Sequence, residues 1–179
     1  MIGELDVLKI VSERLVASRF PFMLTGSFAL AYYATPRMTR DIDIVVALEG
    51  RDVGAVVTAF SPDFYIDADD VRSAVSSQRL FNLMHLASGI KVDLIVRKDS
   101  EYRRGEFQRR REVAISGVET WIVSREDLIL SKLVWATESD SELQRRDVRS
   151  LLGESVDDAY LQRWAGPLGV AELLARLRA

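Results

Sequence analysis

Short apolar runs alternate with amphipathic stretches over the first part of the chain. Apolar residues at helical spacing predict a helix over residues 5–18. The apolar run at 22–25 is bounded by a proline and a glycine and predicts a buried strand, after which the helical pattern returns at 27–33. The run at 41–47 predicts a second strand, and its continuous apolar end favours burial on both faces.

The rest of the chain continues as helices and hairpins and then as helices alone. These patterns predict helices at 50–60 and 67–77, a hairpin of strands at 80–86 and 91–97, and a second hairpin at 112–116 and 119–123. From Ser124 the spacing is helical to the end, and capping-box patterns at Ser124 and Ser155 predict helix starts. We therefore expect an α/β (α+β) fold with a mixed β-sheet flanked by helices. Its core would cover 1–123, and a short helical bundle would cover 124–179.

Two aspartates share one face of the second predicted strand. Side chains alternate along a strand, so Asp41 and Asp43 project from the same face, while the isoleucines between and after them point toward a core. Carboxylates held together repel each other unless a cation or a proton lies between them. This pattern favours a metal-binding strand. The alternative is a polar strand face whose acids pair with Arg37 or Arg40.

A glycine–serine step precedes this strand. Where a strand turns into a helix at Gly26 and Ser27, the first helical amides are free to bind an anion such as phosphate. Glycine allows a phosphate to approach closely, and the serine hydroxyl offers a further hydrogen bond. The dipeptide alone is a common turn. Together with the acid pair it favours a site for nucleotide phosphates.

A third acid interrupts a later apolar strand. Asp93 lies within the run 91–96, where an unpaired buried charge would be costly. Beside Asp41 and Asp43 it would complete three carboxylates, which together with a nucleoside triphosphate (NTP) are the ligands that Mg²⁺ prefers. Two Mg²⁺ ions about 3.5–4 Å apart activate an attacking hydroxyl and stabilise a leaving oxygen. The alternative is an acid on an exposed strand face.

Composition narrows the class of protein further. The 179 residues suit one domain with an appendage, and the net charge of −3 argues against non-specific coating of nucleic acid without excluding a local basic groove. Apolar runs long enough to cross a membrane are absent, and we expect no secretory leader because the first residues lack a signal-peptide pattern. The absence of cysteine excludes disulfides and fits the cytoplasmic location that we expect.

The order of these motifs resembles the nucleotidyltransferase fold of the DNA polymerase β superfamily. Gly26-Ser27, then about a dozen residues, then Asp41-Ile42-Asp43 match the first motif of that fold, and a later strand aspartate follows. The more local likeness is to small bacterial nucleotidyltransferases of the AbiEii type of abortive-infection toxin. It is carried by the motifs Arg37-Met38-Thr39-Arg40-Asp41-Ile42-Asp43, Ser124-Arg125-Glu126-Asp127-Leu128-Ile129 with Lys132, and Arg146-Asp147. The resemblance spans most of residues 22–152.

The resemblance implies roles for the residues of the first motif and the later strand. Gly26 and Ser27 would hold the triphosphate. Asp41 and Asp43 would bind metal. Asp93 would bind the catalytic ion and help to deprotonate the acceptor hydroxyl.

Four further residues are candidates for the nucleotide site, each with a structural alternative. Lys132 would neutralise triphosphate charge, or it is a surface lysine. Asp147 would orient Lys132 or the acceptor, or it is a solvated helix charge. Arg37 and Arg40 would contact phosphate, or they pair with the aspartates.

The resemblance implies transfer of a nucleoside monophosphate from an NTP to an acceptor hydroxyl, with release of pyrophosphate. One implied acceptor is tRNA or another RNA, and a toxin of this type would have a cognate antitoxin. The basic stretch 97–111 would bind such an RNA, or it is a solvated loop. Two other interpretations stay open: an inactive module that binds a nucleotide or a partner, and an antibiotic-modifying nucleotidyltransferase. A polycationic antibiotic would require an acidic cleft.

Overall fold

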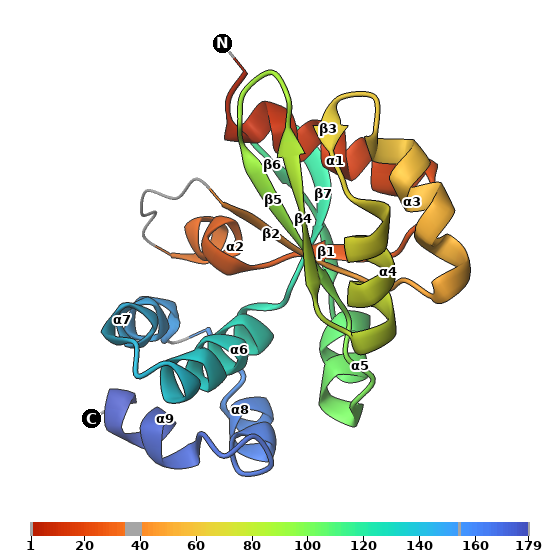
Figure 1. Ribbon diagram of the computed structural model, residues 1–179. Coiled ribbons are helices and arrows are strands. Elements are labelled where there is room, and N and C mark those ends of the chain that lie inside the picture. The colour runs from red at the N-terminus through yellow and green to blue at the C-terminus, as the bar shows by residue number, and fades with distance from the viewer. Residues whose placement is uncertain (1, 35–40, 154, 179) are drawn as a thin grey trace.

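A mixed β-sheet forms the centre of the molecule (Figure 1). The computed structural model describes residues 2–34, 41–153 and 155–178. The strands in these ranges are β1 (Phe22–Leu24), β2 (Ile42–Val46), β3 (Phe64–Tyr65), β4 (Leu80–His85), β5 (Lys91–Val96), β6 (Arg111–Ile115) and β7 (Val118–Ile122). They lie in the order β3-β4-β5-β2-β1-β7-β6. β2 is parallel to β5 and β1 is parallel to β7, whereas the other neighbours are antiparallel.

Helices cover the sheet and extend beyond one end of it. In the described ranges they are α1 (Glu4–Ala17), α2 (Gly26–Tyr33), the 3-10 turn η1 (Gly50–Asp52), α3 (Val53–Phe60), α4 (Ala68–Ser77), α5 (Glu101–Gln108), α6 (Arg125–Glu138), α7 (Glu142–Leu151), α8 (Asp158–Ala165) and α9 (Ala171–Arg178). α1 packs against β7, and α4 packs against β4. α6 to α9 pack on one another and form the group of helices at the lower left of Figure 1.

The two faces of the sheet differ in burial around β2, β4 and β5. Ile42 and Ile44 are fully buried on one face, as predicted, and the alternate residues of β5 and β4 are buried with them. On the other face Leu80 and Met84 are 49% and 48% exposed. The prediction that residues 41–47 are buried on both faces is therefore wrong. This part of the sheet has one core face and one open face, so polar side chains on the open face can meet a ligand.

Sequence patterns located most helices and strands to within a few residues but missed two elements. β3 is too short to give a pattern. α5 lies within the basic stretch 97–111 and is capped by the hydroxyl of Ser100, so the loop interpretation is wrong there. Ser124 caps α6 as predicted, whereas the helix expected from Ser155 begins after Asp157, whose carboxylate caps α8.

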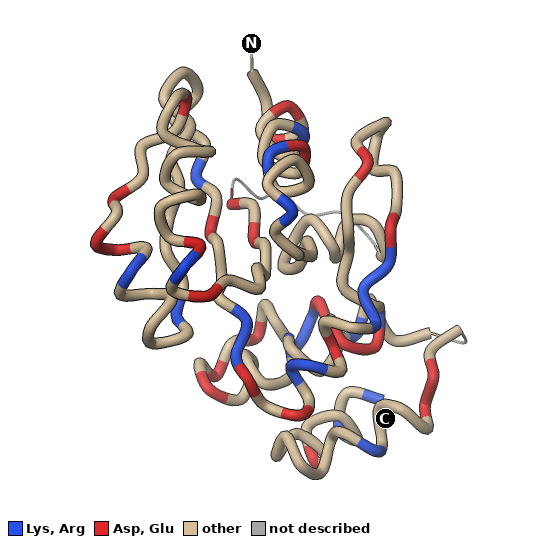
Figure 2. The backbone as a smooth tube through the Cα atoms, turned by 90° about the vertical axis from the view of Figure 1, so that its right-hand side faces the viewer, with Lys and Arg blue, Asp and Glu red and all other residues tan. Residues whose placement is uncertain are grey.

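Charged residues of both signs are mixed along the chain, as Figure 2 shows. With a net charge of −3, an anion-binding surface must come from a few neighbouring basic residues rather than from the total charge. Within the described ranges, no helix combines the length and the apolar character needed to cross a membrane.

Candidate active site

A row of three polar side chains crosses the open face of the sheet. Asp43 on β2 is in register with Asp93 on β5, and Asp93 is in register with Asn82 on β4. Neighbouring strands lie about 4.8 Å apart, and residues in register project from the same face. The Asn82 amide donates a hydrogen bond to Oδ1 of Asp93. Two of the acids that the sequence singled out thus lie side by side.

The Asp43 carboxyl group lies in an environment that disfavours its charge. Burial, followed by the negative charges of Asp93 and Asp41, raises its pKa to about 6, although the ammonium groups of Lys132 and Lys91 act in the opposite direction. A cation placed beside Asp43 would lower this pKa. The charged form of the group is therefore stabilised by any cation that binds next to it.

Asp41 lies at the rim of this acidic cluster. Its side chain is 58% exposed, and its Oδ1 lies 3.9 Å from Nζ of Lys91, which is in turn 3.2 Å from Oδ1 of Asp93. Partial burial lowers the pKa of Lys91, but its hydrogen bond to Asp93 and the nearby carboxylates outweigh this and raise it. Lys91 therefore neutralises part of the acidic cluster.

The turn after β1 is built around Gly26. The Thr25 amide donates a 2.9 Å hydrogen bond to the Asp43 carbonyl, which ties the turn to β2. Gly26 has a φ of 62°, and a Cβ atom at this position would lie 2.0 Å from Oδ2 of Asp43. Glycine is therefore the residue that allows α2 to begin directly against the acid. The side chain of Thr25, the N-cap residue, makes no capping hydrogen bond, so the amides near Gly26 and Ser27 can bind an anion.

A cleft of about 450 Å³ runs from this turn along the open face of the sheet to α6. Asp43 lies in its lining, and Lys132 and Trp135 of α6 form part of the opposite wall. Trp135 is 55% exposed, so it is not a core residue, and its indole ring offers an apolar surface to a ligand. The volume is in the range of small-molecule and cofactor sites.

Lys132 is buried and joins α6 to α7. Only 5% of its side chain is exposed, and its Nζ lies 2.7 Å from Oδ2 of Asp147 and 3.1 Å from Oε1 of Gln144. The alternatives of a surface lysine and a solvated aspartate are therefore wrong. The Lys132 ammonium lines the cleft and lowers the pKa of Asp43, so it can act on the site while it stabilises the helices.

The Lys132→Met variant is expected to lose about 3 kcal/mol of unfolding free energy, because Asp147 would remain buried without its ammonium partner. Urea unfolding followed by circular dichroism measures this loss. The double variant Lys132→Met/Asp147→Leu should regain most of it. Lys9→Met, in an exposed pair with Glu13, is the matched control and should change the free energy by less than about 0.5 kcal/mol. Equal stability of Lys132→Met and the wild type would contradict the buried pair.

The acids fit a magnesium ion in combination with a nucleotide. Across the part of the chain that the structure describes, no three histidine, cysteine, aspartate or glutamate side chains form a group that could hold a metal. Asp43 and Asp93 are hard oxygen donors on adjacent strands, and Mg²⁺ commonly takes one or two carboxylates and completes its shell with water and substrate phosphates. The donor set therefore suits Mg²⁺ bound to a nucleotide better than a preformed three-acid site.

Some residues of the site could not be recognised locally. The sequence analysis singled out neither Asn82 nor Lys91. Lys91 lies two residues before Asp93 on β5 and therefore shares its face, whereas only the register of β4 and β5 places Asn82 at Asp93. Arg37 and Arg40, which we predicted to contact phosphate or the acids, lie outside the residues that the structure describes.

The arrangement of helices and strands is shared with solved structures at low sequence identity. ANT(2'')-Ia in complex with adenylyl-2''-tobramycin is 16% identical, with a TM-score of 0.62, over 91% of this chain and 94% of its own. The chain has the nucleotidyltransferase fold. The lincosamide antibiotic adenylyltransferase LnuA, lincomycin-bound, is 13% identical, with a TM-score of 0.54, over 84% of this chain and 96% of its own. A nucleotidyltransferase-like protein from Paracoccidioides brasiliensis is 18% identical, with a TM-score of 0.53, over 96% of this chain and 89% of its own.

These similarities confirm the fold predicted from the motifs. No model of a protein family and no curated protein matches the sequence. Because the identities lie between 13% and 18%, the similarity concerns the fold, and the likeness to the AbiEii type is carried by the sequence motifs alone.

Proposed function

We propose that the protein transfers a nucleoside monophosphate from an NTP to a hydroxyl group of an RNA acceptor. The observation that carries this proposal is the Asp43–Asp93 pair. Asp43 lies beside the Gly26 turn and lines a cleft large enough for a nucleotide, and Asp93 is in register with it on the adjacent strand. Burial and neighbouring acids disfavour the charge of Asp43, so this arrangement costs folding free energy. A perturbed acid in a cleft favours a functional role.

In the proposed reaction the acceptor oxygen attacks the α-phosphorus, the bond to the β-phosphate oxygen breaks, and pyrophosphate leaves. Asp43 and Asp93 would hold Mg²⁺, which when bound supplies charge neutralisation for the phosphates. Asp93 would accept the hydroxyl proton. Asn82 and Lys91 both donate to its Oδ1 and would keep the carboxylate oriented.

The walls of the cleft would hold the nucleotide. The amides near Gly26 and Ser27 would bind phosphate oxygens, and Lys132 would offset the charge that develops on the leaving pyrophosphate. The exposed ring of Trp135 would pack against the nucleoside. Asp41, at the rim, would contribute negative charge to the metal site.

The basic end of the cleft favours an anionic acceptor. Arg79, Arg97 and Lys98 line it, and among the described residues none of the three forms an ion pair. The Nε atom of Arg97 is buried without a hydrogen-bond partner. Arg97 is four residues beyond Asp93, about 13 Å along a strand, so these cations could bind acceptor phosphates while the hydroxyl lies at Asp93.

The other charges of the cleft are largely compensated within the protein. Arg103 donates to Glu106 at 2.8 Å, and Lys132 is paired with Asp147. The cleft is therefore basic at its far end, which disfavours a polycationic antibiotic as acceptor.

Incubation of the protein with labelled NTP, Mg²⁺ and either total RNA or tobramycin tests the proposal. Label is expected in RNA and not on tobramycin. Label on tobramycin instead would support an antibiotic-modifying activity. Absence of label with all four NTPs and both acceptors would contradict nucleotidyl transfer.

The double variant Arg97→Gln/Lys98→Gln is expected to raise KM for RNA about tenfold with a small change in kcat, because these cations would bind acceptor phosphates. The slope of log affinity against log salt concentration should fall by about one to two. Arg51→Gln/Arg72→Gln removes two exposed cations that are paired with acids and is the control with the same charge change. Equal effects of the two double variants would contradict a specific acceptor site.

Lys91 favours a second candidate, a nucleotide-binding module without turnover. Its ammonium lies 3.2 Å from Oδ1 of Asp93, so it occupies an oxygen of the carboxylate that would bind metal or accept the proton. Calorimetry separates the two candidates. Mg²⁺-dependent NTP binding without product in the transfer experiment would support the module.

A role like that of AbiEii toxins, with a cognate antitoxin and a cytoplasmic location, remains a prediction based on the motifs. A short reading frame for a DNA-binding protein directly upstream of the gene would support it.

A further inference from the structure

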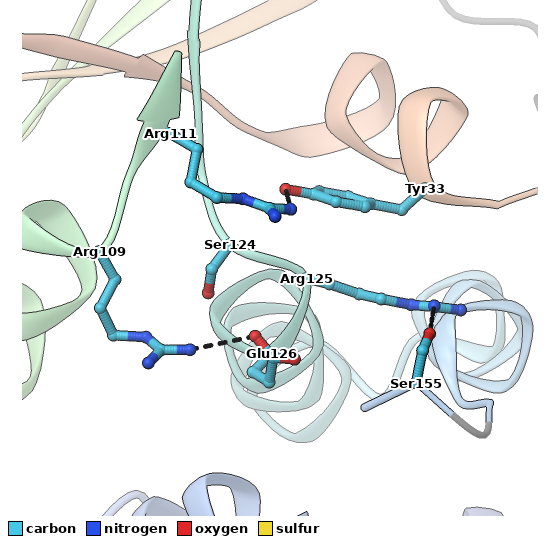
Figure 3. Close-up of a pocket in the computed structure, with 7 residues that line it drawn as sticks. All are labelled: Tyr33, Arg109, Arg111, Ser124, Arg125, Glu126 and Ser155. Atoms are coloured by element: carbon cyan, nitrogen blue, oxygen red, sulfur yellow. Dashed lines mark hydrogen bonds and ion pairs between the residues drawn. The ribbon is translucent and has the colours of Figure 1, made fainter. Parts of the chain in front are cut away.

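A second cavity, of about 400 Å³, lies at the start of α6 and shares no lining residue with the cleft. Three arginines, a tyrosine, two serines and one glutamate line it (Figure 3). These residues come from four segments: α2, the start of β6 and the turn that precedes it, the start of α6, and the loop before α8. Segments far apart in the sequence therefore build this cavity.

Two of the arginines have only neutral hydrogen-bond partners among the described residues. Arg111 donates from Nη2 to the Tyr33 hydroxyl at 2.9 Å. Arg125 donates to the Leu151 carbonyl at 2.8 Å and to the Ser155 hydroxyl at 2.7 Å. Figure 3 shows the Arg111 side chain extending from β6 toward Tyr33 and the Arg125 side chain extending from the start of α6 toward Ser155. Neither guanidinium forms an ion pair with a described carboxylate, although the charge of Glu126 acts on Arg111, so both can still donate to a ligand.

The carboxylate of the cavity is already paired. Glu126 lies 3.1 Å from Nη2 of Arg109, which also contacts the buried Asp127 through Nε at 3.1 Å. The ion pairs of Arg109 with these two acids therefore stabilise the packing of α6. The guanidinium groups of Arg111 and Arg125 remain as the cations of the lining, whereas Glu126 and Asp127 in the first turn of α6 offset the positive end of that helix.

We propose that this cavity binds a phosphate group, with Arg111 and Arg125 as its cationic contacts. Guanidinium groups suit phosphate oxygens because they donate two parallel hydrogen bonds. Tyr33 lies seven residues along α2 from Gly26, about 10 Å, so one phosphate could not reach both sites. The phosphate comes either from a free anion or from a nucleic-acid chain, and the experiment below distinguishes the two. The inference does not rest on the proposed transfer reaction.

The test follows backbone amide signals by NMR while inorganic phosphate, pyrophosphate or a short single-stranded RNA is added. EDTA is present and NTP is absent, so that the proposed catalytic centre is not engaged. Saturable shifts at Arg111, Ser124 and Arg125 are expected. Shifts with phosphate or pyrophosphate identify a free anion, and shifts with RNA alone identify a chain phosphate. Failure of all three probes to move these signals overturns the proposal.

Arg111→Gln/Arg125→Gln is expected to weaken binding about tenfold or more, because two charge-assisted contacts are lost. Arg176→Gln removes one exposed cation of α9 and should bind as the wild type does. If the double variant unfolds, Arg111→Gln replaces it, since the hydrogen bond that it removes is to the Tyr33 hydroxyl. Wild-type affinity in whichever variant folds contradicts the assignment.

Discussion

At pH 8 the Asp43→Asn variant is expected to lose nucleotidyl transfer by at least about a thousandfold and to melt at a higher temperature than the wild type. The loss of transfer corresponds to about 4 kcal/mol of transition-state stabilisation, because the carboxylate beside the phosphates would be gone. Transfer assays and thermal melts on the same preparation measure both effects. Mg²⁺ with NTP should raise the melting temperature of the wild type more than that of the variant.

The gain in stability follows from the pKa of Asp43, which rises from the ordinary 3.8 to about 6 in the fold. Below pH 3.8 the group is protonated in both the folded and the unfolded state and contributes nothing. Between these values the folded state binds the extra proton, so stability falls as pH rises, and the loss is complete above about pH 6. Removal of the charge should return about 3 kcal/mol at pH 8, or about 6–12 °C in melting temperature.

Asp70→Asn, an exposed acid in the first turn of α4, is the control with the same charge change. It should leave transfer unchanged and lower stability by less than about 1 kcal/mol, opposite in sign to the effect at Asp43. At pH 4 the melting temperatures of Asp43→Asn and the wild type should converge, because the wild-type carboxyl is then protonated when folded. A variant that transfers normally, or that melts lower at pH 8, would refute the role assigned to Asp43.

Gly26→Ala is expected to destabilise the protein by about 2–5 kcal/mol and to reduce transfer to background. A positive φ costs a residue with a Cβ about 1–2 kcal/mol. The added Cβ would also lie 2.0 Å from Oδ2 and 2.7 Å from Cγ of Asp43, so the whole carboxyl group would have to move, at about 1–3 kcal/mol. Urea unfolding and the transfer assay measure the two losses.

Two other glycines separate the causes of this effect. Gly89 has a φ of 70°, and a Cβ added there would have no other group within 4 Å, so Gly89→Ala should cost about 1–2 kcal/mol through backbone strain alone and leave transfer unchanged. Gly54 has open space and no positive φ, and Gly54→Ala should change stability by less than about 1 kcal/mol. If Gly26→Ala costs no more than Gly89→Ala, the close approach to Asp43 is not what requires glycine at 26.

Much of the core could be predicted because its elements have strong local periodicity. The alternation around Asp43 placed it opposite the fully buried Ile42 and Ile44, and the helix start at Ser124 was visible from its capping pattern. The same reasoning failed for the burial of the strand. The apolar Val45 lies on the open face, where it is partly buried and lines the cleft. It also failed for α5, whose charged face gives little apolar pattern.

The candidate site was likewise predictable from the sequence only in part. The sequence by itself determined that Asp41 and Asp43 follow a Gly-Ser turn and that Asp93 interrupts a strand. Local spacing encodes the face from which a side chain projects, so these statements needed no tertiary contacts.

Only the tertiary structure decided which of these groups meet. The order β4-β5-β2 sets Asp93 between Asp43 and Asn82, and the packing of α6 on α7 buries Lys132 against Asp147. The cavity of about 400 Å³ at the start of α6 likewise depends on four separate elements. Strand order, register and burial arise from contacts between residues distant in the chain, and a single sequence carries no local signal for them.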